Sequence, residues 1–157
     1  QVLRAVWSAA VAAPALALTG MALILPWITA TQTPTSRPGR AIAQFFGDSF
    51  QRRVNRPLPA VAGDPQLAAL IALGPSRPRL VRLDAPARGP WLAPDKFNET
   101  GGVVVWRASD TVGTPPPEIA GRFPGLVPEV PQGFDWLVNG RAAPLRIGWA
   151  VVRPKGP

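Results

Sequence analysis

The residues with the clearest chemical possibilities lie at a turn near the middle of the chain, where Gly63 and Asp64 follow a short apolar run. Loops that bind phosphate place several glycines before a helix, so that backbone N–H groups can approach the anion. This turn has one glycine, and Pro65 supplies no N–H. Two interpretations stay open. Asp64 caps a helix that Pro65 opens, or the turn contacts a ligand at the carboxyl end of the first strand of an open sheet.

Paired carboxylates are a second possible source of chemistry, because they can perform general acid–base catalysis. Asp95 and Glu99 are four residues apart and share one face of a predicted helix, with Lys96 beside them. These charges are interpreted either as solvated surface or as a contact of Asp95 and Lys96 with a ligand or partner. Trp91, which follows Pro90, could contact lipid, sugar or protein, or pack beneath a loop.

The composition excludes the most familiar catalytic centres. The chain has no His, no Cys and no Tyr, so it can form neither a Ser-His triad nor a thiolate metal site. We therefore predict no catalytic residue, no metal ligand and no cofactor. The net charge is +8, but the arginines form no long basic run with interleaved aromatic residues, so we expect no nucleic-acid partner.

The first 30 residues predict a membrane anchor. Residues 5–30 contain no charged side chain, and about 20 helical residues span the hydrocarbon core of a bilayer. Trp7 and Trp27 lie near the two ends of this stretch, where aromatic side chains favour the membrane interface. A cleaved signal peptide and a buried core helix are the alternatives. We expect a single-pass transmembrane helix in contact with membrane lipid.

The rest of the chain predicts a linker, residues 31–39, and one folded domain, residues 40–157. Apolar spacing and capping signals predict four helices, over 40–55, 66–73, 92–100 and 118–122. Four strands are predicted, over 58–62, 80–83, 103–106 and 145–152, and the alternating pattern of the last is typical of an edge strand. The predicted fold class is therefore α/β: one N-terminal transmembrane helix followed by a small three-layer domain with a mostly parallel sheet.

Several short motifs, taken in order, resemble one protein class. They lie at 56–64 (RPLPAVAGD), 76–78 (SRP), 90–92 (PWL), 101–106 (GGVVVW) and 146–150 (RIGWA). They resemble the C-terminal transmembrane helix and periplasmic domain of bacterial multi-pass glycosyltransferases, the aminoarabinose-transferase-like and protein-mannosyltransferase-like enzymes that use polyprenyl-phosphate sugars. In that family the catalytic acid and the lipid-phosphate site belong to earlier segments that this sequence does not contain. The resemblance therefore implies no catalytic residue here.

The resemblance also implies a location and a role. Charge leaves the orientation of the helix open, since Arg4 favours a cytoplasmic N-terminus and Arg37 and Arg40 favour the reverse. The family places the helix in the bacterial inner membrane and the domain in the periplasm. We predict a non-catalytic accessory subunit docked to other integral-membrane subunits of a larger complex.

Two other hypotheses are kept. The chain, which begins at Gln1, could be a fragment of a complete integral-membrane glycosyltransferase whose catalytic helices lie outside it. It could also be a sugar- or lipid-binding module that uses Asp64 and Trp91.

Overall fold

A computed structural model describes residues 2–28, 37–83, 94–137 and 143–155. The chain forms two compact units, one of residues 1–37 and 135–143 and one of residues 38–134 and 144–157. The first unit contains helix α1 (Val2–Ile28), and the second contains the sheet and the other helices.

Helix α1 is the predicted N-terminal helix, but the prediction that it spans a membrane is wrong. Within the residues that the structure describes, no helix is both long enough and apolar enough for a membrane crossing. The prediction relied on the uncharged stretch of residues 5–30, which is long enough for a helix to cross the hydrocarbon core of a bilayer.

This correction removes the transmembrane, single-pass and inner-membrane assignments. It also removes the reason to place Trp7 and Trp27 at a membrane interface. Both tryptophans belong to α1, and their side chains lie outside the described part of the chain.

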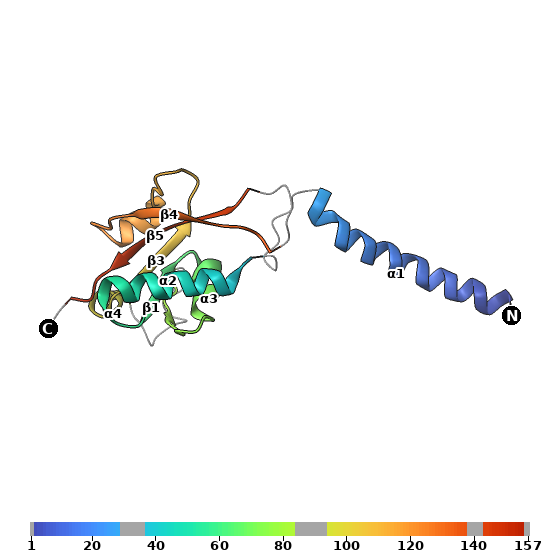
Figure 1. Cartoon of the computed structure of the whole chain (residues 1–157), viewed down its shortest axis with the longest axis horizontal. Helices are drawn as coiled ribbons and strands as arrows, with labels where there is room; N and C mark the ends of the chain where they lie inside the picture. The colour runs from blue at the N-terminus through green and yellow to red at the C-terminus, as the bar shows by residue number, and fades with distance from the viewer. Residues whose placement is uncertain (1, 29–36, 84–93, 138–142, 156–157) are drawn as a thin grey trace. The chain divides into compact units, whose positions relative to one another are not determined.

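The second unit is built on a five-stranded sheet with the strand order β2-β1-β3-β5-β4 (Figure 1). The strands are β1 (Ala60–Gly63), β2 (Arg79–Leu80), β3 (Gly102–Arg107), β4 (Glu129–Phe134) and β5 (Leu145–Val152). Strand β1 pairs in parallel with β2 and β3, whereas β5 pairs antiparallel with β3 and β4. The α/β class is confirmed, but the sheet is mixed, and the prediction of a mostly parallel sheet is wrong.

Strand β4 accounts for this difference. It contains Pro131 and Gly133, residues that weaken a strand signal, and it was not among the predicted strands. Strand β4 lies at one edge of the sheet, and the chain then turns back into β5, which lies between β4 and β3. Strand β5 therefore runs antiparallel to β3 and lies inside the sheet. The strand over 145–152 is confirmed, but the prediction that it forms an edge is wrong.

Helices cover both faces of the sheet. They are α2 (Gly39–Val54), α3 (Pro65–Ala72), α4 (Pro94–Thr100) and α5 (Pro117–Arg122). Helices α2 and α3 pack on each other, and both contact β3. On the other side, Phe97 of α4 and Ile119 of α5 share a buried cluster with Val104 and Trp106 of β3. Successive residues of β3 therefore face different helices, and the domain has three layers.

Helix α2 is fixed to the antiparallel side of the sheet by an aromatic cluster. The ring of Phe46 lies 6.2 Å from Phe134 of β4 and 5.5 Å from Trp149 of β5, measured between centroids. The guanidinium of Arg53 lies 4.8 Å from the centre of the Trp149 ring and pairs with Glu129 at 3.1 Å. The contact of Phe46 with Trp149 is edge-on, and such a contact adds about 0.5–1.5 kcal/mol to the burial of the rings.

Candidate functional site

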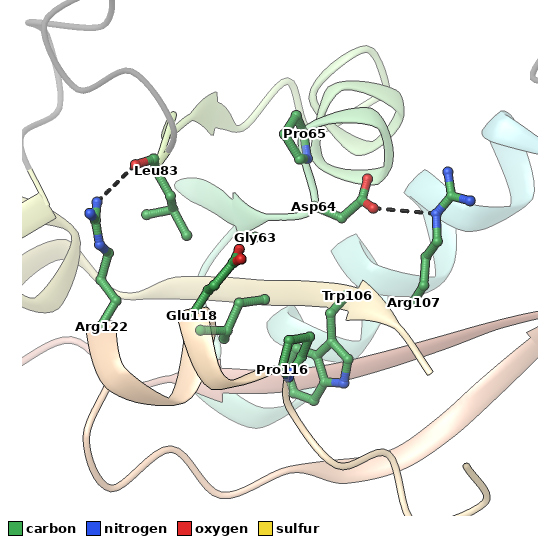
Figure 2. Close-up of a pocket in the computed structure, with 10 residues that line it drawn as sticks. Gly63, Asp64, Pro65, Leu83, Trp106, Arg107, Pro116, Glu118 and Arg122 are labelled. Atoms are coloured by element: carbon green, nitrogen blue, oxygen red, sulfur yellow. Dashed lines mark hydrogen bonds and ion pairs between the residues drawn. The ribbon is translucent and has the colours of Figure 1, made fainter. Parts of the chain in front are cut away.

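A pocket of about 470 Å³ opens where β1 and β3 end (Figure 2). Strand β1 continues into α3 on one face of the sheet, whereas β3 leads to α5, whose Ile119 packs on the other face. The two connections diverge, because the first leads to β2 and the second to β4, which lie at opposite borders of the sheet. Open α/β sheets bind ligands at such a switch point, outside the carboxyl ends of the strands. We refer to this pocket as the crevice.

Asp64 lies at the start of one wall of the crevice and caps helix α3. Its Oδ1 accepts hydrogen bonds from the backbone N–H groups of Gln66, at 2.9 Å, and Leu67, at 3.0 Å. Pro65 occupies the first position of the helix. The interpretation as a tight turn with a helix cap is therefore confirmed. The helix N-terminus is occupied by a carboxylate and leaves no cradle for a phosphate.

Gly63 allows β1 and β3 to approach each other at this turn. Its φ of +113° lies in the region that favours glycine, and a Cβ there would lie 1.8 Å from the carbonyl oxygen of Val105. The same carbonyl accepts the N–H of Asp64 at 2.8 Å. Gly63 is therefore needed for the backbone conformation that places Asp64 at the edge of the crevice.

Arg107, the last residue of β3, lies beside Asp64. Its Nε is 3.3 Å from the Oδ2 of Asp64, and its Nη2 donates a hydrogen bond of 2.7 Å to the Oε1 of Gln66. The Arg107 side chain is 49% exposed, so water screens the ion pair and the pair stabilises the fold by at most about 1 kcal/mol. These contacts hold the end of β3 against the beginning of α3.

The opposite wall comes from α5, which supplies Glu118 and Arg122 (Figure 2). The Nη1 of Arg122 donates a hydrogen bond of 2.9 Å to the carbonyl oxygen of Leu83. Trp106 and Ile119 are buried and contribute apolar lining. The described lining of the crevice therefore combines apolar side chains with two cationic and two anionic ones, whose charges cancel.

The loop that leads from β3 to α5 is braced by Asp110. Its carboxylate accepts the N–H groups of Gly113, at 2.7 Å, and Thr114, at 3.0 Å, and also the Thr114 hydroxyl. The hydrogen bond from the Thr114 hydroxyl, followed by the one from its N–H, lowers the pKa of Asp110 below the usual 3.8. This turn delivers Pro116 and Glu118 to the crevice.

The structure brings two of the predicted contact residues together. Gly63 and Asp64 line the crevice side by side. Lys96 is exposed on α4 and does not line it. Trp91 lies outside the described residues, and so does the side chain of Asp95.

Another tryptophan of the chain, Trp136, does not line the crevice. It is 8% exposed, and its Nε1 donates a hydrogen bond of 2.8 Å to the carbonyl oxygen of Ala143. This side chain is packed, as buried tryptophans with a satisfied N–H usually are.

Sequence reasoning missed Arg107, Glu118 and Arg122. Arg107 carries a usable signal, because it directly follows the apolar strand 103–106, as Asp64 follows the apolar part of β1. The carboxyl ends of adjacent parallel strands meet at one edge of a sheet, so the two residues could have been paired. Glu118 and Arg122 carry no such signal, because their place depends on the path of the loop from β3 to α5.

Within the described part of the chain, no group of three or more acidic side chains is placed to hold a metal ion. In comparisons with known proteins, the chain matches no family model, no curated protein and no solved structure. The resemblance to polyprenyl-phosphate-sugar glycosyltransferases therefore stays a prediction.

Proposed function

We propose that the α/β domain is a non-catalytic accessory module that binds a small polar molecule in the crevice. The position of the crevice carries this proposal, because it lies at the switch point of the sheet, between the ends of β1 and β3. Its size suits a small ligand, and its combination of apolar lining and a few charged groups is that of a typical binding site.

The contacts of the charged residues favour binding over catalysis. Both carboxylate oxygens of Asp64 already serve the fold, one as a helix cap and one in the pair with Arg107. A guanidinium group donates hydrogen bonds and has no acceptor, so neither Arg107 nor Arg122 supplies a general base. Among the described residues that line the crevice, Glu118 is then the one carboxylate available to a ligand, and none of them supplies a second group for an acid–base pair.

The accessory role is supported by the motif order described above. The class that these motifs resemble keeps its catalytic acid in segments other than the C-terminal domain. A domain of this kind would influence a reaction by holding a small molecule or by contacting a partner protein, not by performing the chemical step.

The proposal is tested by titrating the isotope-labelled full chain with a panel of sugars, amino acids, organic acids and phosphate esters, followed by amide chemical shifts. We expect at least one compound to give saturable shifts clustered at Gly63, Trp106 and Arg107. Glu118→Trp, which fills the opening, is expected to abolish them. Glu99→Trp, an equivalent change at an exposed position of α4, serves as the control.

Two results would contradict the proposal. The first is a complete absence of saturable shifts across the panel. The second is a response that survives Glu118→Trp unchanged, since the ligand would then bind elsewhere.

A further inference from the structure

The four charged side chains in the described lining of the crevice differ in how many hydrogen bonds and ion pairs they form with the rest of the protein. Asp64 is fully engaged through both oxygens. Arg107 uses its Nε and Nη2 on Asp64 and Gln66, and its Nη1 forms no hydrogen bond with the described residues. Asp64 and Arg107 therefore form an internal pair with one free N–H edge.

Arg122 and Glu118 are less satisfied. The hydrogen bond of Arg122 is to the carbonyl of Leu83, which orients the guanidinium without neutralising its charge. In the described part of the chain the ion pairs are Arg53–Glu129 and Arg107–Asp64, so neither Arg122 nor Glu118 belongs to one. The two residues are one helical turn apart on α5 and line the same wall.

From these contacts we infer that the crevice binds a small organic oxyanion with a neighbouring hydroxyl group. The inference rests on the proposed function and names the ligand class of the same site. The oxyanion binds the free N–H edge of Arg122, because a guanidinium matches carboxylate and phosphate oxygens with two parallel hydrogen bonds. The hydroxyl of the ligand donates to the carboxylate of Glu118, which accepts hydrogen bonds and has no donor of its own when ionised.

Other ligand classes fit these charges less well. A polyanion would be repelled by the carboxylates of Asp64 and Glu118, and a simple cation by the two guanidinium groups. A neutral polyol would satisfy Glu118 but would leave the charge of Arg122 without a counter-charge. One negative group with an adjacent donor satisfies both residues of α5.

Calorimetric titration of the full chain tests this inference with four probes. Glycerate and glycerol 3-phosphate carry an oxyanion and hydroxyl groups, whereas propionate lacks the hydroxyls and glycerol lacks the charge. We expect at least one of the first two to bind about tenfold or more tightly than propionate and glycerol, since a charge-assisted hydrogen bond contributes at least that factor. A preference for glycerate or for glycerol 3-phosphate distinguishes a carboxylate ligand from a phosphate ester.

Variants of α5 assign the two contacts. Arg122→Gln is expected to weaken binding of the preferred oxyanion about tenfold or more, and Glu118→Gln is expected to weaken glycerate more than propionate. Arg52→Gln and Glu99→Gln make the same charge changes at positions outside the crevice and are expected to leave the affinities unchanged.

The outcomes separate the inference from the proposed function. If glycerol or an amine binds in the crevice and neither glycerate nor glycerol 3-phosphate does, the ligand class is wrong while the binding function stands. Binding of the oxyanions that is insensitive to Arg122→Gln also overturns the inference. Absence of a response to the whole wider panel overturns the proposed function itself.

Discussion

Trp106 of β3 packs so closely on Gly148 of β5 that a Cβ atom at Gly148 would lie 2.2 Å from the indole Nε1. The two residues are directly opposite each other in the antiparallel register, so their side-chain positions share one face of the sheet. Trp106 is buried and lines the crevice. The absence of a side chain at position 148 is therefore what lets the indole pack against β5 at the site.

The first prediction concerns this contact. Gly148→Ala is expected to destabilise the domain by about 1–3 kcal/mol, because the added methyl group forces the indole or the strand to move. Urea unfolding of the variant measures the change. Gly121→Ala in α5 is the control, since nothing lies within 4 Å of a Cβ there. A Gly148→Ala variant as stable as the wild type would contradict the close packing of Trp106 on Gly148.

A second prediction follows from combining two substitutions. Trp106→Phe withdraws the atoms that would meet the new methyl group, so the cost of Gly148→Ala is expected to be smaller in the Trp106→Phe background. Residues in contact typically show a coupling energy of about 0.5–3 kcal/mol in such a cycle. The Nε1 of Trp106 is buried without a hydrogen-bond partner, so the Phe variant loses no hydrogen bond to the described residues. Strict additivity of the two changes would argue against the contact.

The third prediction separates the two roles of Asp64. Asp64→Ala is expected to cost about 0.5–2 kcal/mol, because the N–H groups of Gln66 and Leu67 lose their cap. Asp64→Asn keeps a capping oxygen and loses the charge that pairs with Arg107, so its cost is expected to be much smaller. Thermal unfolding compares the two. Asp48→Ala, at an exposed position of α2, provides the control.

The fourth prediction concerns pH. Because hydrogen bonds from Thr114 lower the pKa of Asp110 in the folded protein, the ionised carboxylate stabilises the fold above its usual pKa of 3.8. This contribution is lost as the pH falls through the lower pKa of the folded state. NMR titration is expected to give a pKa below 3.8 for Asp110 in the wild type and a higher value in Thr114→Val. An unchanged pKa in that variant would contradict the assignment.

The fifth prediction concerns the attachment of α2. Arg53→Met keeps the aliphatic stem and removes both the ion pair to Glu129 and the contact with the Trp149 ring, so we expect a loss of about 0.5–1.5 kcal/mol. Because the ion pair is partly exposed, water screens it and it contributes little to this loss of stability. Most of the loss is therefore expected to persist in high salt. Arg52→Met, the neighbouring change, is expected to cost less than about 0.5 kcal/mol. Equal effects of the two changes would exclude a special role for Arg53.

The sequence predicted the helices and most strands because local signals agree with the fold there. Asp64 and Pro65 mark the start of α3, and the apolar run 103–106 marks β3. It failed where the outcome depends on residues far apart in the chain. Pro131 weakens the strand signal of β4, so this strand was not predicted. Without β4, no local pattern in the sequence indicates that the strand 145–152 pairs antiparallel with β3.

The same distinction applies to the crevice. Gly63 and Asp64 were found because a turn after a strand is a local pattern. Arg122 reaches the site because a loop braced by Asp110 carries the chain to α5, and its guanidinium is then held by the carbonyl of Leu83. The spacing of residues in the sequence alone does not predict that Arg122 reaches the crevice.

The two borders of the sheet limit how this domain can associate with other chains. At one border β2 offers two residues, and at the other β4 has an irregular register between Glu129 and Gln132 and a proline at position 131 that has no N–H to donate. The described residues of the two borders therefore offer another strand no continuous row of free backbone N–H groups with which to pair. Recognition of a partner must rely on side chains, and fibril-like stacking through these borders is disfavoured even at high protein concentration.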